Sequence, residues 1–505
     1  MKMDIAEQLR RRILILDGAM GTRIQSMGLR PEDYHRGRFS QWQMSLAGNN
    51  DILCLTAPEV ISTIHRQYVE AGADIITTNT FSANRISQHE YGCEEVARDM
   101  ARAGASIARQ VADSFVPLPS DHRKRIWVAG SMGPTSKSLS LASDMNEPGY
   151  RAITFDEMAT AYYEQAKALI EGGADMLLLE TCFDALNAKA AIYGIEQLNE
   201  ETGKEIPLMV SATINDRSGR TLTGQTLEAF CISISHYPHL LSFGLNCAFG
   251  VTELRPFVEQ LSNTIPVFLS LYPNAGLPNE MGEYDELPSF TARHLKQMAE
   301  AGLINIAGGC CGTNEEHIRA ISEALRDIQP RDISRRSPFT DKLWLSGIDS
   351  LLVDKESRNF TNVGERTNVA GSRKFARLIA EKKYEEAIAV ARHQIEGGAA
   401  IIDINMDDAM LDSRQEMQTF CRYIANDPAV SRSVLMIDSS DWDTILAGLK
   451  NAQGKCIVNS ISLKNGEEHF ISKAKMLRRL GAAVVVMAFD ENGQATTFER
   501  KTAIA

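Results

Sequence analysis

Four segments of the chain share one pattern of apolar and polar positions. In each, a stretch with helical periodicity ends in a Glu-Xaa-Gly phrase, and an apolar run starts within a few positions; the phrases begin at Glu70, Glu171, Glu300 and Glu396. Glycine suits the left-handed conformation that ends many helices, and an uninterrupted apolar run is typical of a strand buried on both faces. The pattern therefore predicts the repeated helix-to-strand junctions of a parallel α/β fold.

Eight apolar runs of this kind precede residue 330. We expect strands at residues 13–18, 74–81, 126–133, 175–181, 208–214, 240–247, 267–274 and 304–312. Eight strands separated by helical segments within about 300 residues predict a closed (β/α)8 TIM barrel. A doubly wound open sheet is the alternative. It would normally carry Gly-Xaa-Gly-Xaa-Xaa-Gly after its first strand, and Gly18-Ala-Met-Gly21 lacks that spacing.

A second series of strands follows a change in composition. Past Glu323 the helical pattern gives way to a stretch with Pro330, Pro338 and mixed charge, which favours a linker. Five further strands are expected at residues 360–367, 399–406, 433–439, 456–462 and 482–490. An unclosed barrel exposes a strand edge, so the chain is expected to be a fragment of a longer one. The expected domains are a barrel at 1–327, a linker at 328–357 and a truncated second (β/α) barrel at 358–505.

Composition and charge narrow the class of protein. Of the 505 residues, 44% are hydrophobic and 23% charged, which is typical of globular proteins and excludes overall disorder. The net charge of −12, without a basic run, argues against nucleic-acid or anionic-membrane partners. No apolar run approaches the roughly 20 residues that span a bilayer. Nine cysteines in so long a chain argue against a secreted disulfide scaffold, and we expect a cytoplasmic protein.

Candidate chemistry is expected at the carboxyl ends of the barrel strands, where the active sites of such barrels lie. The polar residues at these ends in the first barrel are Asp17, Asn79, Thr80, Glu180, Thr181, Asn246, Cys247, Asn274, Cys310 and Cys311. Three thiols at one rim stand out. Thiolates select zinc, and a site with three protein ligands leaves a fourth position for water or substrate. Zinc held by three thiolates favours activation of a substrate thiol over polarisation of a carbonyl.

The cysteines also have competing interpretations. Adjacent residues on a regular strand point to opposite faces, so Cys310 and Cys311 can reach one metal only if the backbone bends, as Gly308, Gly309 and Gly312 would permit. A glycine-rich phosphate loop after the eighth strand is the competitor, and the distant Cys247 favours zinc. The six remaining cysteines are each isolated in or beside an apolar element and are expected to be core thiols: Cys54, Cys93, Cys182, Cys231, Cys421 and Cys456.

Two carboxylates, Asp17 and Glu180, belong to the same rim. They could recognise a substrate ammonium group or act as acid or base, and the alternative is capping of the helix that follows each strand. Both interpretations stay open for Asp17. Glu180 ends the apolar run MLLLE, where a carboxylate without a partner is costly, and this favours a functional role.

In the second series, Asp and Asn residues recur at strand ends. These polar residues are Asn362, Glu365, Arg366, Asp403, Asn405, Asp438 and Asn459. Neighbouring acceptors and donors suit a flat heterocycle with an amidine-like edge, such as a pterin. From these residues alone, capping of the turns between strands and helices is the better interpretation.

Eight short motifs together resemble known families. LDGAMGT (16–22), TTNTF (77–81), GLNC (244–247) and GGCCGT (308–313) resemble the homocysteine-binding barrel of zinc-dependent homocysteine methyltransferases. NVGERTNVAGS (362–372), DINMDDAMLD (403–412), MIDSS (436–440) and NSIS (459–462) resemble the pterin-binding barrel. In this order they resemble the cobalamin-dependent methionine synthases (5-methyltetrahydrofolate–homocysteine methyltransferases), along essentially the whole chain.

The resemblance implies a reaction and the residues that carry it. It implies methyl transfer to the thiol of homocysteine to form methionine, with Cys247, Cys310 and Cys311 as zinc-binding catalytic residues and Asp17 and Glu180 near the substrate amino group. It also implies 5-methyltetrahydrofolate as co-substrate, with pterin contacts from Asp438 and Asn459 and less directly from Gly371, Ser372, Asp403 and Asn405. Methylcobalamin would be bound by a cobalamin-binding module that is absent from this chain, as is the reactivation module.

Two alternatives remain from the sequence. A homocysteine methyltransferase that uses betaine or S-methylmethionine needs only the first barrel, and the pterin-like second series argues against it. A non-catalytic module that binds zinc through its thiols is the other alternative, since the chain lacks the modules needed for a complete reaction cycle.

Overall fold

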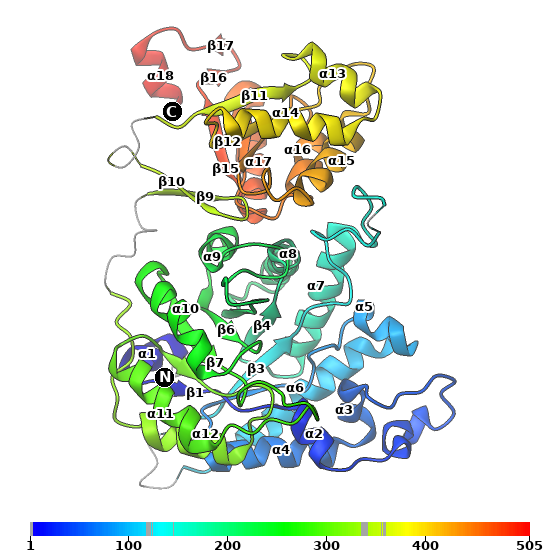
Figure 1. Ribbon diagram of the computed structural model, residues 1–505, viewed down its shortest axis with the longest axis vertical. Helices are drawn as coiled ribbons and strands as arrows, with labels where there is room; N and C mark the ends of the chain where they lie inside the picture. Colours follow the sequence, from blue (N-terminus) through cyan, green and yellow to red (C-terminus); the bar gives the residue numbers. More distant parts are fainter. Residues whose placement is uncertain are drawn as a thin grey trace.

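The computed structural model describes residues 4–117, 123, 125–144, 146–334, 342–354, 356 and 360–505. Two α/β domains lie one above the other along the longest axis (Figure 1), the first drawn in blue to green and the second in yellow to red. An antiparallel hairpin of β9 (Leu343–Ser346) and β10 (Ser350–Val353) lies between them.

The first domain is a closed parallel barrel of eight strands. They are β1 (Leu14–Ile15), β2 (Ile75–Thr77), β3 (Trp127–Met132), β4 (Met176–Cys182), β5 (Leu208–Ala212), β6 (Leu240–Asn246), β7 (Phe268–Tyr272) and β8 (Ile306–Ala307). Their order in the sheet is β1-β8-β7-β6-β5-β4-β3-β2, and a parallel bridge between Leu16 and Ile75 joins the two ends. The predicted (β/α)8 barrel is confirmed.

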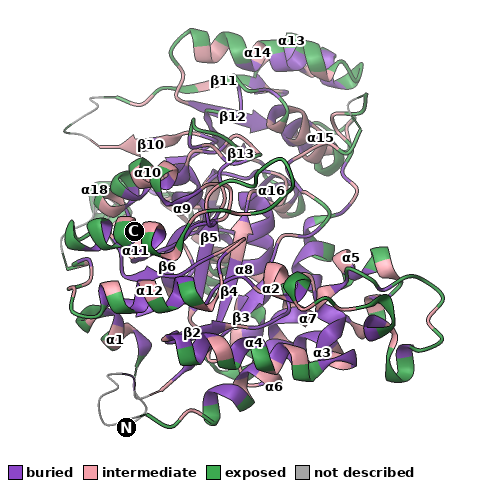
Figure 2. Ribbon diagram, turned by 60° about the horizontal axis from the view of Figure 1, so that its bottom comes forward, coloured by how far each residue is buried: buried purple, intermediate pink, exposed green. Residues whose placement is uncertain are grey.

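Helices surround this barrel on the outside (Figure 2). The longer ones are α4 (Pro58–Ala71), α6 (Ala97–Asp113), α7 (Phe155–Glu171), α8 (Ala185–Thr202), α9 (Leu227–Ile234), α10 (Val251–Thr264), α11 (Pro288–Glu300) and α12 (Glu315–Leu325); α1 (Ile5–Arg11) precedes β1, and α2 (Gly21–Ser26) follows it. The glycines expected at helix ends, Gly72, Gly173, Gly302 and Gly398, have φ of +114°, +104°, +68° and +97°. These left-handed helix ends confirm the junctions that the repeated phrase predicted.

Apolar side chains fill the barrel interior toward the amino ends of its strands. Leu14, Ile75, Trp127, Met176 and Phe268 belong to one buried cluster that is separate from the layer between strands and helices. Because this cluster fills the interior at the amino end, we look for a ligand site at the carboxyl ends of the strands.

The second domain is an open parallel sheet in chain order. Its strands are β11 (Val363–Asn368), β12 (Ile401–Asn405), β13 (Val434–Asp438), β14 (Ile457–Ser462) and β15 (Ala483–Met487), alternating with α13 (Arg373–Ala380), α14 (Tyr384–Glu396), α15 (Ser413–Ala425), α16 (Trp442–Leu449) and α17 (Glu467–Arg479). A short hairpin of β16 (Phe489–Asp490) and β17 (Gly493–Gln494) and helix α18 (Phe498–Ile504) follow. Among the described residues β11 and β15 do not pair, so the domain is an incomplete (β/α) barrel.

The hairpin β9–β10 falls within the predicted linker, where the composition gave no sign of strands. It contacts both domains: the carbonyl of Ile348 accepts a hydrogen bond from Thr226 N (2.9 Å), and the Ile348 amide donates to the carbonyl of Ser431 (2.8 Å). Residues 335–341, 355 and 357 of the predicted linker lie outside the described residues. The boundaries 1–327, 328–357 and 358–505 stay a prediction.

Within the described ranges, every helix is too short or too polar to cross a lipid bilayer.

Candidate functional site

Three cysteine side chains meet at the carboxyl end of the first barrel. Cys247 follows β6 directly, and Cys310 and Cys311 lie in the loop between β8 and α12. Their Sγ atoms all lie within 4.8 Å of one another, and those of Cys247 and Cys311 are 3.8 Å apart. A tetrahedral ion with metal–sulfur distances of about 2.3 Å separates its sulfur ligands by about 3.8 Å. The spacing and the soft donor set therefore fit zinc.

Backbone geometry brings these sulfurs together. Cys247 and Ala248 have φ of +59° and +62°, a left-handed conformation that is uncommon for residues with a Cβ. Among Gly308, Gly309 and Gly312, Gly312 alone has a left-handed φ (+80°). The bend expected in the Cys310–Cys311 loop therefore relies on Gly312 rather than on Gly308 or Gly309. The Cys310 amide donates to the carbonyl of Pro273 (2.7 Å). This hydrogen bond and one from the Cys311 amide to the Asn274 side chain (3.1 Å) fix the backbone of the cysteine loop.

The thiol cluster stabilises one negative charge. Hydrogen bonds from the thiols of Cys310 and Cys311 lower the pKa of Cys247 to about 3. The same interactions with Cys247 raise the pKa of Cys310 well above its ordinary value and that of Cys311 to about 11. Three thiolates so close together therefore require a cation.

The cluster opens into a cavity of about 330 Å³. The cavity is lined by all three cysteines, by Asp17 and Glu180, and by the glycine-rich residues that follow β1. Five of the residues singled out from the sequence thus share one space. Asn79 and Thr181 line it as well, so most of the predicted rim faces a common volume.

Asp17 links the first two strands. Its carboxylate accepts hydrogen bonds from the Thr77 amide (2.8 Å) and the Thr77 hydroxyl (3.0 Å), and burial raises its pKa well above the ordinary value. Helix α2 starts after Met20 without a side-chain cap. The alternative that Asp17 caps the following helix is therefore wrong.

Glu180 faces the cavity from the end of β4. Its carboxylate accepts a hydrogen bond from the Ser131 hydroxyl, and burial raises its pKa to about 7. Asp184, not Glu180, caps α8, because its carboxylate accepts from the amides of Leu186 and Asn187. The capping alternative is wrong for Glu180 too.

Sequence reasoning missed several residues that line this cavity, among them Asp51, Tyr272 and Phe81. Asp51 is buried in the short 3-10 helix η3 (Asn50–Ile52), accepts a hydrogen bond from the Ser82 amide (3.1 Å) and has its pKa raised to about 7 by burial. Tyr272 is buried at the end of β7, and Phe81 is 39% exposed. Tyr272 lies two residues before the candidate Asn274, so a wider search around the end of this predicted strand would have found it. No periodic pattern marks Asp51.

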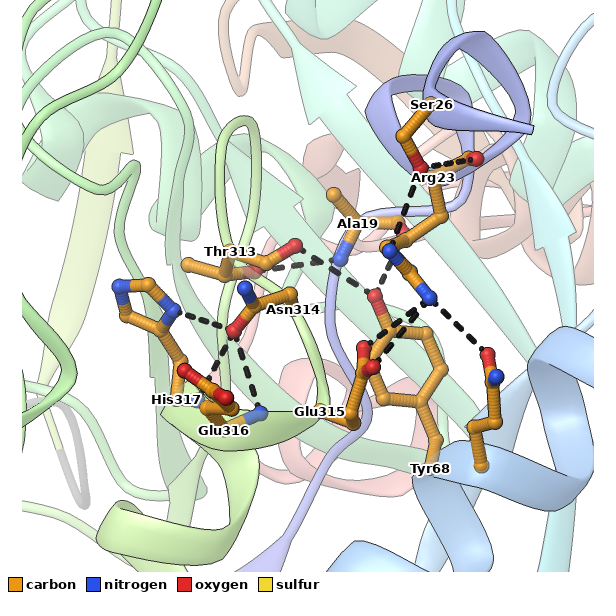
Figure 3. Close-up of polar contacts among 10 residues, drawn as sticks. Ala19, Arg23, Ser26, Tyr68, Thr313, Asn314, Glu315, Glu316 and His317 are labelled. Atoms are coloured by element: carbon orange, nitrogen blue, oxygen red, sulfur yellow. Dashed lines mark hydrogen bonds and ion pairs between the residues drawn. The ribbon is translucent and has the colours of Figure 1, made fainter. Parts of the chain in front are cut away.

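A polar network joins the loop after β1 to the cysteine loop (Figure 3). The Thr313 hydroxyl donates to the carbonyl of Cys310 (2.7 Å) and accepts from the Ala19 amide (3.2 Å). The Tyr68 hydroxyl donates to the carbonyl of Ala19 (2.6 Å), and Arg23 pairs with Glu315. The loop after β1 and the cysteine loop are therefore held as one unit.

The second domain carries a polar row at the carboxyl edge of its sheet. Asn368, Asn405, Asp438 and Asn459 are paired in register across four neighbouring strands, β11 to β14. The Asn405 amide donates to Asp438 (3.0 Å), and Asn368 donates to Asp403 (3.4 Å). Burial raises the pKa of Asp403 to about 7, with a further contribution from Asp438, whose own pKa burial also raises.

Gly371 and Ser372 lie in the turn between β11 and α13. The Gly371 amide donates to the Asn368 side chain (2.9 Å), which also reaches Asp403, so Gly371 is close to the polar row. The Ser372 hydroxyl caps α13 by accepting from Phe375 N (3.3 Å). The other strand-end candidates of this domain are exposed: Asn362, Glu365 and Arg366.

Comparison with known proteins divides the chain in the same way. Residues 14–325 match the family described as homocysteine S-methyltransferase, and residues 364–504 match the one described as pterin binding enzyme. The oxidized form of the homocysteine methyltransferase MmuM from Escherichia coli is 22% identical, with 62% of this chain and 95% of that chain covered and a TM-score of 0.47. The metallated form of the same protein is 21% identical, with 63% of this chain and 98% of that chain covered and a TM-score of 0.46.

Proposed function

The chain belongs to the homocysteine S-methyltransferase family, and on that premise we propose that its first barrel methylates the thiol of homocysteine to form methionine, at a zinc ion held by Cys247, Cys310 and Cys311. The observation that carries this proposal is the convergence of three sulfurs on a cavity that also presents Asp17 and Glu180. An amino acid with a terminal thiol has complementary groups, a sulfur at one end and an ammonium at the other.

Each group of the site has a defined task in this proposal. Bound zinc would supply the positive charge that keeps the substrate thiol deprotonated at neutral pH, where a free thiol with a pKa of about 8.5 is mostly protonated. Asp17 and Glu180 bind and orient the substrate ammonium, which in turn compensates their buried charge. The substrate sulfur then forms its bond to the methyl carbon, while the bond from methyl to donor breaks and leaves its electron pair on the donor.

For the methyl source we propose 5-methyltetrahydrofolate, bound at the second domain. Asn405, Asp438 and Asn459 of the polar row, together with the neighbouring Asp403, offer the donors and acceptors of a pterin edge, with Gly371 and Ser372 beside them. Because the two sites lie in different domains, the methyl group needs a carrier. We propose cobalamin for this role, presented by a cobalamin-binding partner module, as in methionine synthases. Nine free cysteines suit a reducing, cytoplasmic location.

The first test is metal and substrate binding by the purified chain. We expect about one zinc per chain, homocysteine binding that requires the metal, and methyl transfer from free methylcobalamin to homocysteine. Cys310→Ala should lose both metal and homocysteine binding, because two thiolates hold zinc much less tightly than three. The matched control is Cys231→Ala, which removes a buried thiol far from the cavity and should keep both.

Three outcomes would change the assignment. Normal homocysteine binding by Cys310→Ala would contradict it. Turnover with betaine or S-methylmethionine, and none with methylcobalamin, would favour an enzyme that uses those donors. Zinc binding with no transfer from any donor would indicate a non-catalytic thiol-rich module.

A further inference from the structure

Asn246, the last residue of β6, is buried at the carboxyl end of the first barrel, next in the chain to Cys247. Its Oδ1 accepts a hydrogen bond from the Thr181 amide (3.0 Å), and its Nδ2 donates to the Thr181 hydroxyl (2.8 Å). The same Nδ2 lies 3.7 Å from the Sγ of Cys310, within hydrogen-bonding range for sulfur. The residue is only 1% exposed, so these contacts are shielded from bulk solvent. One side-chain amide thus contacts both Thr181, which follows Glu180, and the Cys310 thiol.

On the carboxylate side, Asn246 supports an irregular strand end. The register between β4 and β5 shifts between Leu179 and Cys182, and Thr181 has φ of +57°, which is strained for a β-branched residue. In a regular strand, neighbouring side chains point to opposite faces. Here Glu180 and Thr181 both line the cavity, while Cys182 packs in the outer layer. The paired hydrogen bonds from Asn246 hold this bulge, and with it the direction of Glu180.

On the thiol side, Asn246 is joined to Cys247 by the peptide bond and to Cys310 by its side-chain N–H. Groups that hydrogen-bond to metal ligands fix the orientation of those ligands and change the metal affinity. The position of two of the three sulfurs therefore depends on the same amide that holds Thr181.

We propose that Asn246 is a positioning residue that sets the separation between the thiol cluster and the Glu180 carboxylate, and so selects homocysteine over cysteine, which is one methylene shorter. This inference rests on the proposed function for the identity of the ligand. A cavity with a fixed separation between its two ends discriminates against a chain one methylene too short by roughly tenfold or more. If Asn246 is removed, both ends can shift and the discrimination should fall.

The test compares two variants that separate the two contacts. Asn246→Ala removes both, whereas Thr181→Val removes only the hydroxyl that accepts from Asn246 and leaves the N–H near Cys310. We expect Asn246→Ala to shift the thiolate-to-metal charge-transfer band of the Co²⁺-loaded chain, to lower Co²⁺ affinity about tenfold, and to reduce the preference for homocysteine over cysteine. Thr181→Val should reduce the preference without shifting the band. Calorimetry gives the two dissociation constants.

The matched control is Asn305→Ala, because Asn305 is equally buried but lies at the amino end of the barrel, where it bonds Leu269 N (2.9 Å) and the carbonyl of Arg331 (2.8 Å). An unchanged cobalt band and unchanged preference in Asn246→Ala would overturn the inference, and so would the same changes in Asn305→Ala. Failure of the unmodified chain to bind homocysteine would instead contradict the proposed function. In that case the charge-transfer band of Co²⁺-loaded Asn246→Ala would still show whether Asn246 positions the Cys310 thiol.

Discussion

At the scale of single residues, partners distinguish functional carboxylates from structural ones. Asp184 and Asp412 accept hydrogen bonds from backbone amides at the starts of α8 and α15, so helix capping explains both residues. Glu180 lies near the carboxyl end of β4 and Asp403 in the middle of β12, and burial raises the pKa of each to about 7. A carboxylate that is costly to ionise is stabilised by a cation or by a hydrogen-bonding ligand, so burial supports the proposal that these residues bind ligands.

Asp403 should make stability fall as the pH rises. Its pKa is about 7 in the folded chain and about 3.9 in an unfolded one, so between these values the folded state binds more protons. The free energy of unfolding therefore decreases from about pH 4 to pH 7. Asp403→Asn cannot ionise, so its free energy of unfolding should exceed that of the unmodified chain by more at pH 8 than at pH 5, the gain between the two pH values being roughly 1–3 kcal/mol. Urea unfolding at the two pH values measures this difference.

The control for Asp403 is Asp408→Asn, an exposed carboxylate of the following loop. Its effect should be the same at both pH values. An Asp403→Asn chain that gains nothing at pH 8 would show that the Asp403 carboxylate ionises at its usual pH.

At the scale of elements, the loop after β8 is shaped by one glycine. Gly312 has φ of +80°, and a Cβ there would lie 2.3 Å from the Tyr284 side chain. Gly312→Ala should therefore destabilise the chain by several kcal/mol, since the left-handed conformation alone costs an alanine about 1–2 kcal/mol. Because Cys311 is its neighbour, zinc content should fall too. Urea unfolding and metal analysis check both.

Gly203 provides the matched comparison. It ends α8 with φ of +64°, and no atom lies within 4 Å of a Cβ built there. Gly203→Ala should show only the conformational cost and full zinc content. Equal effects of the two substitutions would mean that the contact with Tyr284 does not constrain the cysteine loop.

At the scale of the whole molecule, the two domains share a buried interface. Lys189 on α8 is buried in the first domain, and its Nζ donates to the carbonyls of Ala452 (3.2 Å) and Gly454 (3.1 Å) in the second. Arg151 donates to the carbonyl of Arg422 across the same interface (3.1 Å). The hairpin β9–β10 lies beside these contacts between the domains (Figure 1).

Lys189→Met should weaken this interface. It leaves the buried carbonyl of Ala452 without its donor and that of Gly454 with only the Cys456 thiol (3.6 Å), and an unpaired buried group costs about 1–3 kcal/mol, although removal of a buried charge offsets part of this. We expect a lower urea midpoint and faster proteolysis within residues 360–505. Lys204→Met, at an exposed position of the first domain, should change neither. Unaltered protection in Lys189→Met would show that the other contacts suffice to hold the domains together.

Much of the fold followed from local patterns. All thirteen expected barrel strands occur at the predicted places, and the six isolated cysteines are buried as expected. The hairpin β9–β10 was missed because its short strands are stabilised by contacts with Thr226 and Ser431, which are distant in sequence. Asp51 was missed for the same reason, since its burial depends on neighbours that no local pattern reveals.

The sequence by itself determined the order of strands and helices and which residues stand at the strand ends, because the periodicity of apolar residues records which face of each element is buried. It also singled out three thiols with the chemistry of a zinc site. Only the tertiary structure decided that Asp17 bonds Thr77 rather than a helix end, that burial shifts Glu180 and Asp403, and that Asn246 connects Thr181 with Cys310. Each of these depends on groups brought together from distant strands, and hydrogen bonding and desolvation act through space rather than along the chain.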